Sequence, residues 1–269
     1  MFKKIISYLL SFILVVVALA DILLIVLSST VLNKNHILST LTKNAYYSQI
    51  YYDITETFKD NTIQSGLSEE VLNGIITKEQ VKEDVDYVIS YLYEIKNEEF
   101  QINTTDIENN LRKNINNQIK ENNKNTTEEE QEEIDIYVNN IIKIYKDGIM
   151  YSEEYIKPIQ KAIIYIKPIA DKCIIILTIT VLVLIAILIL INKRKIYAYL
   201  SITLIADGMI LILIKVLEAT TMKIQNILIF NQAFSKVLIN LIENIIILYL
   251  IVGTIMIFGG ILISIKQRK

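Results

Sequence analysis

Glycine, proline, cysteine, histidine and tryptophan are all scarce in this sequence of 269 residues. There are seven Gly and two Pro, about 3% of the chain together, against a usual share of about 12%. So few turn-forming residues exclude a sandwich or barrel built from many short strands. One Cys and one His exclude a disulfide framework, a Cys/His zinc cluster and a Cys–His catalytic pair within the chain.

Hydrophobic residues, in contrast, make up 52% of the chain and form four long runs. A helix crosses a hydrocarbon core about 30 Å thick with roughly 20 apolar residues. The runs predict transmembrane helices over residues 5–32, 173–191, 196–217 and 245–265. We therefore expect an all-α, multi-pass membrane protein with four transmembrane helices.

Basic residues flank these runs on only one side of a four-span arrangement. Lys3 and Lys4 precede the first run, three basic residues fill the turn after the second, and three follow the fourth. The positive-inside rule makes this side cytoplasmic, with both termini inside and the chain in the plasma membrane. The expected cytoplasmic segments are 1–4, 192–195 and 266–269, and the expected extracytoplasmic segments are 33–172 and 218–244.

A cleaved signal peptide is the alternative for the N-terminal run. Ala18, Leu19 and Ala20 imitate a small-residue cleavage site. The apolar run continues over residues 22–27, where a mature secreted protein usually turns polar. This continuation favours a retained signal anchor.

The extracytoplasmic segment is acidic and has the pattern of helices. Residues 33–172 hold 16 basic and 25 acidic side chains, a net charge of −9. Thr77, Thr105 and Thr127 each precede a Gln or Glu by three residues, as in a capping box. Apolar residues recur every three or four positions after each Thr, and also between Leu38 and Phe58. These patterns predict an elongated antiparallel helical bundle with a core of its own, including a short helix over 69–76.

Two prolines interrupt the last helical pattern of this segment. A four-three apolar alternation runs from Val138 to Ala170 and is typical of a coiled-coil seam. Pro158 and Pro168 lie inside it, each in the sequence Ile-Lys-Pro-Ile. Because proline removes a helical hydrogen bond, we expect a hinge or kink near the membrane surface. It is either a static bend or a joint that transmits motion.

Three ionisable residues fall inside the predicted spans: Asp21, Asp207 and Lys215. A carboxylate at the bilayer centre costs about 2.5–3.5 kcal/mol on insertion scales, so it rarely faces lipid. The helical rise places Asp207 near the midplane and Asp21 at a depth similar to that of Lys215. We expect Asp21 and Lys215 to pair, and Asp207 to be protonated or hydrogen-bonded in the interior. The functional alternative makes Asp207 an ion or proton site in a transport path.

Tyrosine is abundant, with sixteen copies. Helical spacing places Tyr47 beside Tyr51 and Tyr87 beside Tyr91, which could form an aromatic wall of an external binding surface. The alternative is an amphipathic core and rim, with apolar rings and hydrated hydroxyls.

The last two spans contain pairs of small residues, and the loop that joins them is apolar. Ser201 and Gly208, and likewise Gly253 and Gly260, lie seven apart, which allows close helix approach either within a hairpin or in a homo-oligomer. The 218–244 loop is rich in apolar residues, which favours a helix that lies in the membrane interface.

The arrangement of one span, a large external domain and three further spans resembles the permease subunits of mechanotransmitting ABC systems. Such a resemblance implies a separate ATPase. The turn at 192–195 is too short for the cytoplasmic coupling helix of those subunits, so the sequence assigns the chain to no family.

These observations favour a non-enzymatic membrane protein whose extracytoplasmic helical domain binds a partner or senses the state of the cell envelope. The external segment has no nucleophile elbow and no ordered metal-ligand pattern. We expect no cofactor, no metal and no nucleic-acid partner, but a lipid bilayer, a protein partner in the membrane or envelope, and possible self-association. The alternative is a transporter or permease component built around Asp207.

Overall fold

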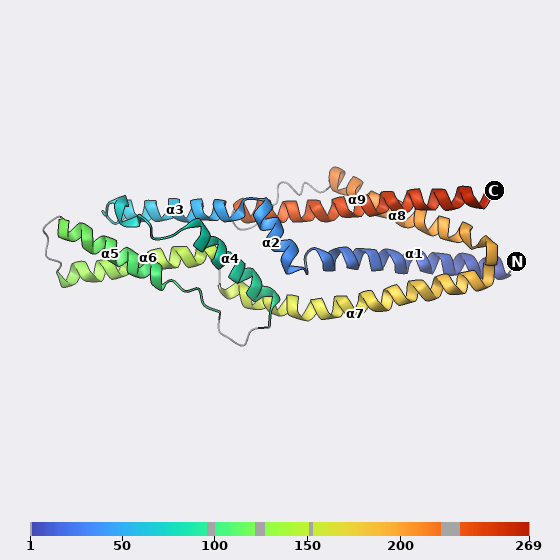
Figure 1. Ribbon diagram of the computed structural model, residues 1–269, viewed down its shortest axis with the longest axis horizontal. Coiled ribbons are helices and arrows are strands. Elements are labelled where there is room, and N and C mark those ends of the chain that lie inside the picture. The colour runs from blue at the N-terminus through green and yellow to red at the C-terminus, as the bar shows by residue number, and fades with distance from the viewer. Residues whose placement is uncertain (1, 96–99, 122–126, 151–152, 222–231, 269) are drawn as a thin grey trace. The chain divides into compact units, whose positions relative to one another are not determined.

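The computed structural model describes residues 2–95, 100–121, 127–150, 153–221 and 232–268 (Figure 1). Regular structure in these ranges is all helical, without strands, as predicted. The elements are α1 (Phe2–Ser29), α2 (Lys34–Lys43), α3 (Tyr46–Gln64), η1 (Glu69–Leu72), α4 (Lys78–Tyr93), α5 (Thr105–Glu121), α6 (Glu128–Met150), α7 (Glu153–Asn192), η2 (Lys193–Lys195), α8 (Ile196–Thr221) and α9 (Gln232–Arg268).

Four of the described helices are long and apolar enough to cross a membrane. They cover Phe2–Ser29, Ile156–Asn192, Ile196–Ala219 and Ser235–Lys266. This confirms the prediction of four candidate membrane-spanning helices, by length and composition, and suggests a membrane protein. The last helix begins at Gln232, so the C-terminal part of the predicted 218–244 loop is helical and continuous with the fourth span. Of the predicted interfacial helix, residues 222–231 lie outside the described residues, and the rest belongs to the end of α8 and the start of α9.

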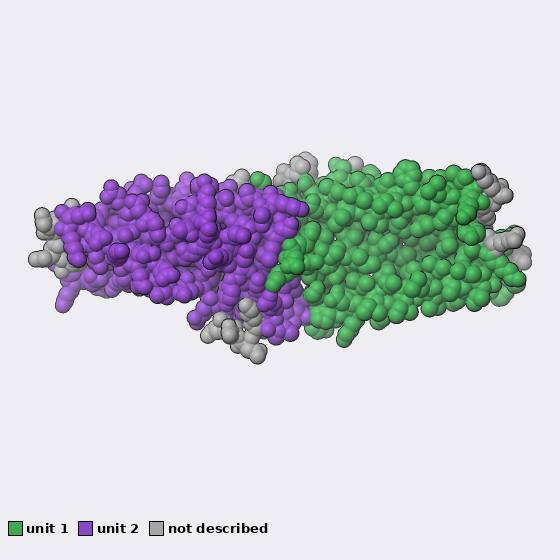
Figure 2. Space-filling view, in the orientation of Figure 1, with its two compact units in different colours: residues 1–37, 165–269 green, residues 38–164 purple. Residues whose placement is uncertain are grey.

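The chain divides into two compact units, coloured separately in Figure 2. Unit 1 contains residues 1–37 and 165–269, and unit 2 contains residues 38–164. The chain passes from one unit to the other within α2, at 37/38, and within α7, at 164/165. The second of these boundaries lies between Pro158 and Pro168.

In unit 1 the helices α8 and α9 approach most closely where both lack a side chain. A Cβ atom on Gly208 would lie 2.5 Å from the carbonyl oxygen of Gly253, so only glycine permits this separation. Ser201 Oγ, on α8, donates a hydrogen bond of 2.8 Å to the carbonyl oxygen of Gly260 on α9. The small residues singled out in the sequence therefore pack the α8–α9 hairpin within one chain.

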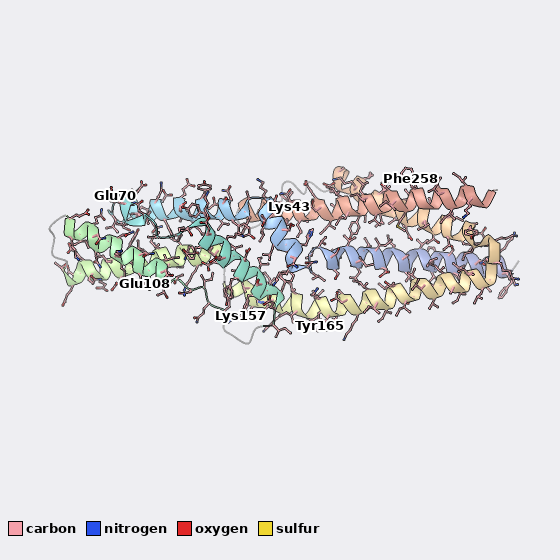
Figure 3. The ribbon with its side chains drawn as sticks, viewed as in Figure 1. Lys43, Glu70, Glu108, Lys157, Tyr165 and Phe258 are labelled. Atoms are coloured by element: carbon pink, nitrogen blue, oxygen red, sulfur yellow. The ribbon has the colours of Figure 1, made fainter. Side chains whose placement is uncertain are left out.

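Apolar side chains cover much of the outer surface of unit 1. Phe258 of α9 is 64% exposed and Tyr165 of α7 is 72% exposed; both are labelled in Figure 3. A helix that is apolar on its outer face as well as its inner one suits a lipid environment.

Unit 2 has its own apolar core, to which α3, α4, α5 and α6 contribute. Its residues recur at helical spacing and are at most 3% exposed: Ile50, Ile54, Phe58, Val81, Val85, Ile107, Leu111, Ile115, Val138, Ile141 and Tyr145. Gly148 of α6 allows close contact with α3, because a Cβ atom there would lie 2.5 Å from Ile54 Cγ1. The apolar stripes predicted after the three Thr residues are thus the buried faces of α4, α5 and α6.

Two of the three predicted capping boxes begin their helices as expected. Thr77 Oγ1 accepts from the Gln80 amide, and Thr127 exchanges hydrogen bonds with Glu130 in both directions. The capping box at Thr105 is wrong, because the Thr105 amide itself donates to the side chain of Asn103, which takes over the helix start.

Three further helical predictions need correction. The helix predicted from Leu38 onward is broken at Ala45, whose φ of 54° lies in the left-handed region. The short helix predicted for 69–76 is confined to η1. The apolar row that begins at Val138 is not buried as far as Ala170, because Ile159 and Ile166 are 46% and 50% exposed.

Both prolines lie inside α7, which is a continuous helix from Glu153 to Asn192. Pro158 and Pro168 therefore do not end the helix, although each lacks the amide that its position would otherwise donate. On the unit 2 side, Gln160 Nε2 donates to the carbonyl oxygens of Tyr91 and Glu94, at 2.7 and 3.0 Å. Whether the prolines act as a hinge stays a prediction.

Candidate functional site

One face of α1 carries buried polar side chains in an otherwise apolar helix. Ser7 is fully buried, Ser11 is 5% exposed and Asp21 is 8% exposed. Their spacing of four and ten residues keeps them on the same side of a helix with 3.6 residues per turn. The interior of unit 1 therefore contains a row of polar groups along α1.

Each of these three side chains meets a polar group of another helix. Ser7 Oγ donates to Asn192 Oδ1 at 2.9 Å, near the junction of α7 and α8. Ser11 Oγ lies 3.3 Å from Thr203 Oγ1 of α8. Asp21 Oδ2 accepts from Thr178 Oγ1 of α7 at 2.9 Å. These contacts join α1 to both neighbouring helices by hydrogen bonds, in addition to apolar packing.

Asp207 lies on the same face of α8 as Thr203, one turn further along the helix. Its side chain is fully buried. Neither of its carboxylate oxygens has a hydrogen-bond partner among the described residues. Transfer of an isolated charged carboxylate into a low-dielectric interior is very costly, whereas a neutral carboxyl group costs far less. Asp207 was predicted to be either protonated or hydrogen-bonded. The described residues supply no hydrogen bond, so the contacts do not support the second of these states.

The structure does not join Asp21 to Lys215. Lys215 Nζ instead forms a 2.6 Å ion pair with Glu218 Oε2, three residues later on α8. Asp21 is held by Thr178, as described above, and its Oδ1 atom has no partner among the described residues. The predicted pair was based on depth alone, but a partner on the same helix satisfies Lys215 without bridging to α1.

The four tyrosines predicted as an aromatic wall separate into different environments in unit 2. Tyr47 is 9% exposed and its hydroxyl donates to Asp86 Oδ1 at 2.6 Å. Burial, together with this hydrogen bond, raises the pKa of the Tyr47 phenol above its ordinary value. Tyr51 instead packs against Tyr52 in an edge contact, with the ring centroids 5.7 Å apart. Tyr47 thus ties α3 to α4 and is not part of an open surface.

Tyr87 and Tyr91 are brought together by a residue that the sequence analysis did not single out. Phe100 stacks on Tyr87, with ring centroids 5.6 Å apart, and makes an edge contact with Tyr91 at 4.7 Å. Phe100 is 2% exposed and Tyr91 is 5% exposed. This group is an interior cluster, as the amphipathic-core interpretation predicts. An aromatic residue after the end of a helix gave no periodic signal by which it could be found.

A second Tyr–Asp pair lies in the core of unit 2. The hydroxyl of Tyr145, on α6, donates to a carboxylate oxygen of Asp84 on α4. Burial raises the pKa of Tyr145, and the hydrogen bond to Asp84 adds to this rise. Burial also raises the pKa of Asp84, although the hydrogen bond from Tyr145 opposes the change. The pair is a fixed contact of the core.

An open cleft of about 460 Å³ lies in unit 2 between the residues after α3, the end of α5 and the first half of α6; we call it the α5–α6 cleft. Its lining residues are Ser65, Gly66, Leu67, Gln118, Ile119, Glu130, Glu133, Ile134, Ile136, Tyr137 and Asn140. Two carboxylates thus stand beside apolar side chains, of which Ile136 is 64% exposed. Gln118 Oε1 is buried without a hydrogen-bond partner among the described residues.

A second cleft, of about 470 Å³, is formed by α3, η1 and the segment up to Ile76, and Glu70 in Figure 3 marks its wall. Tyr52 lines it and is 55% exposed. Lys78 Nζ lies 4.6 Å from the centroid of the Tyr52 ring and donates to its hydroxyl at 3.0 Å. The most exposed aromatic ring of this cleft is therefore already in contact with a cation.

Comparison with known proteins identifies no relative, since no family model, curated protein or solved structure matches this chain. The site must therefore be interpreted from its own geometry.

Proposed function

We propose that this chain is a non-enzymatic integral protein of the plasma membrane whose helical unit 2 lies on the extracytoplasmic side and binds a protein partner or senses the state of the envelope. The observation that carries the proposal is the α5–α6 cleft, an open cleft in which two carboxylates lie beside apolar side chains of a compact unit.

The orientation is supported by where the basic residues gather. The start of α1, the α7–α8 turn and the end of α9 lie at one end of unit 1 (Figure 1), and these segments contain Lys3, Lys4, Lys193, Arg194, Lys195 and Lys266. A cluster of basic residues at one end of four spans favours the cytoplasmic side for that end. Unit 2, inserted between the first and second spans, then belongs to the opposite side.

The chemistry of the α5–α6 cleft favours a cationic, amphipathic segment as its occupant. Residues 38–164 carry 13 basic and 24 acidic side chains, a net charge of −11. Glu130 and Glu133 line the cleft beside Ile134 and Tyr137. Basic side chains of a partner would meet the carboxylates, and apolar ones would cover the exposed surface of Ile136.

Site-specific photocrosslinking in native cells tests this function. A benzophenone amino acid at Ile136 should crosslink a discrete protein, and the same probe at Lys146, an exposed position outside both clefts, should not. Glu133→Lys should abolish the crosslink, because it reverses a charge of the rim and leaves the Thr127–Glu130 capping bonds intact. Equal crosslinking from both positions, or a crosslink that survives charge reversal, would count against the cleft as a binding site.

Transport is the second candidate function, and Asp207 favours it. A buried carboxyl group without a partner is unusual in a span that has only a packing role, and such residues mark ion or proton pathways in many membrane proteins. If Asp207→Asn leaves both protein abundance and every measured proton or cation flux in proteoliposomes unchanged, this candidate is wrong. Partner binding by unit 2 does not depend on the result.

A further inference from the structure

The surroundings of Asp207 are closed on the side where α9 approaches. Gly208, the next residue, meets the backbone of Gly253 so closely that no side chain fits between the two helices. One turn further along, Leu211 is fully buried and packs in an apolar cluster with Tyr249. Asp207 is thus one helical turn from this apolar cluster in one direction and one turn from Thr203, which is 4% exposed, in the other.

Among the described residues, no charged group of the helices that pack against α8 is bonded to Asp207. On α1 the ionisable groups are Lys3, Lys4 and Tyr8, all of which precede Ser11, and Asp21. Ser11 lies beside Thr203, so Asp207 is level with about residue 15 of α1 and Asp21 is about 9 Å further along. On α9, Tyr249 donates to the carbonyl oxygen of Leu23 at 3.2 Å.

The remaining ionisable groups lie further away along the helices. On α9, Glu243 is ten residues from Gly253, or about 15 Å of helical rise. On α8 itself, Lys215 is about 12 Å beyond Asp207 by the same rise and is paired with Glu218. A metal cation would need several oxygen ligands, and no group of three or more acidic, His or Cys side chains suited to a metal occurs in the part of the chain that the structure describes. The ligand that suits a single buried carboxyl group is a proton.

A row of hydroxyl and amide groups runs from one end of unit 1 toward this carboxyl, with no described hydrogen bond between Ser7 and Ser11 or between Thr203 and Asp207. It begins at Asn192 and Ser7, which are hydrogen-bonded at 2.9 Å, and continues with Ser11 and Thr203, 3.3 Å apart. Side chains in a helix tilt toward its N-terminus, so the side chain of Asp207 leans toward Thr203. A hydroxyl group both donates and accepts a hydrogen bond, and can therefore take part in proton exchange without a change in net charge.

From this geometry we propose that Asp207 is a proton-binding site in the interior of unit 1, supplied through Ser11 and Thr203 from the end of the unit at which α7 and α8 are joined. The proton binds to a carboxylate oxygen and leaves by the same row, and no other reactant is needed. This inference deepens the second candidate function by naming the ligand and its route. It concerns binding alone, so it stands whether or not net transport occurs.

Infrared spectroscopy of the full chain in lipid nanodiscs tests the binding. We expect a C=O band of a protonated carboxyl group at neutral pH in the wild type. The band should be lost in Asp207→Asn and retained in the matched variant Asp21→Asn, which alters the buried carboxyl group of α1. Absence of the band from the wild type overturns the proposal even if no variant folds. Loss of the band on addition of sodium would also overturn it, since the site would then hold a cation.

Exchange of the same proton for deuterium tests the route. After transfer to D₂O, the shift of the Asp207 band should be slower by up to about tenfold in Ser11→Ala and Thr203→Val, the factor that corresponds to the loss of one hydrogen bond. Ser201→Ala is the control, because Ser201 donates to the backbone of Gly260 outside the row. Equal exchange rates in all three variants and the wild type would overturn the route.

Discussion

Individual polar residues are buried in two different ways in this protein. In unit 2 two half-buried carboxyl groups have tyrosine partners: Asp84 accepts from Tyr145 and Asp86 accepts from Tyr47. In unit 1, Asp207 has no hydrogen-bond partner among the described residues. A paired polar group fixes the packing of a core, whereas an unpaired one needs a proton or another ligand to be stable. The contrast separates structural carboxylates from the candidate functional one.

Removal of the Tyr145 hydroxyl should destabilise unit 2. Tyr145→Phe leaves the half-buried carboxylate of Asp84 without this donor, at a cost of about 1 kcal/mol. Hydrogen exchange of the full chain in nanodiscs should show faster exchange of amides in α4 and α6. Tyr52→Phe is the control, because it removes a tyrosine hydrogen bond at an exposed position, the one from Lys78 to a side chain that is 55% exposed. Similar protection in both variants would mean that the Tyr145–Asp84 bond contributes nothing to stability.

Asp84 should also make the stability of unit 2 depend on pH. Burial raises its pKa in the folded protein above the unfolded value. The folded state therefore binds the proton more tightly, so this contribution to stability is complete below the unfolded pKa and is lost as the pH rises through the raised value.

The neutral variant Asp84→Asn removes this dependence and keeps an oxygen that accepts from Tyr145. When wild type and variant are compared at each pH, the variant should gain stability relative to the wild type as the pH rises from acidic to neutral. The measurement is amide protection in α4 at matched pH. A constant difference between the two proteins across the range would contradict the prediction.

At the scale of the elements, local patterns predicted the helices but not their exact ends or partners. The apolar runs and the caps at Thr77 and Thr127 involve neighbours in sequence, so they could be recognised directly. The break at Ala45 gave no signal, since alanine is a strong helix former and adopts a positive φ only under tertiary constraint. The extension of α9 back to Gln232 was missed because its polar residues imitate a loop.

The same distinction explains how much of the candidate site could be predicted. Asp207 could be found from the sequence alone, because it is an acidic residue in an otherwise apolar run. Its lack of a hydrogen-bond partner among the described residues depends on how α1 and α9 pack on α8. The spacing of residues along one helix does not predict such packing. Ser7 and Ser11 lie four residues apart in the first span and could have been noticed, but their partners Asn192 and Thr203 are more than 180 residues away.

The α8–α9 hairpin makes a prediction of its own. Gly208→Ala places a methyl group 2.5 Å from the backbone of Gly253 and should destabilise the hairpin by about 1–3 kcal/mol, the usual cost of overpacking. Gly259→Ala is a matched control on α9, because a Cβ atom there meets nothing within 4 Å. The midpoint of unfolding in SDS, followed by circular dichroism in mixed micelles, should fall for the first variant alone. Equal midpoints would contradict the close approach of the two helices.

At the scale of the whole molecule, the order of the segments along the chain matters more than any single contact. Unit 2 is an insertion between the first and second apolar helices, and the chain enters and leaves it within α2 and α7. With four spans, such an insertion lies on the opposite side of the membrane from the basic turn at Lys193–Lys195. The net charge of −11 in residues 38–164 and the basic flanks of the spans are thus predicted to face different compartments.

Cysteine labelling in intact cells checks this topology. The lone Cys173 is replaced by Ser, and single cysteines are introduced by Ser65→Cys in unit 2 or Lys195→Cys in the turn. A membrane-impermeant maleimide should label the first position in intact cells and the second only after permeabilisation. The reverse pattern would invert the proposed orientation, and labelling of both in intact cells would contradict the four-span arrangement.

The polar face of α1 also determines the sequence of events during biosynthesis. Thr178, the partner of Asp21, is 157 positions later in the chain, so it is translated roughly 8–30 s after Asp21 at about 5–20 residues per second. Until then α1 is in the membrane or its insertion machinery with Ser7, Ser11 and Asp21 all lacking the partners they have in the folded protein. Insertion of α1 and assembly of unit 1 are therefore separate steps, and a nascent chain stalled before α7 would expose a carboxylate within the bilayer.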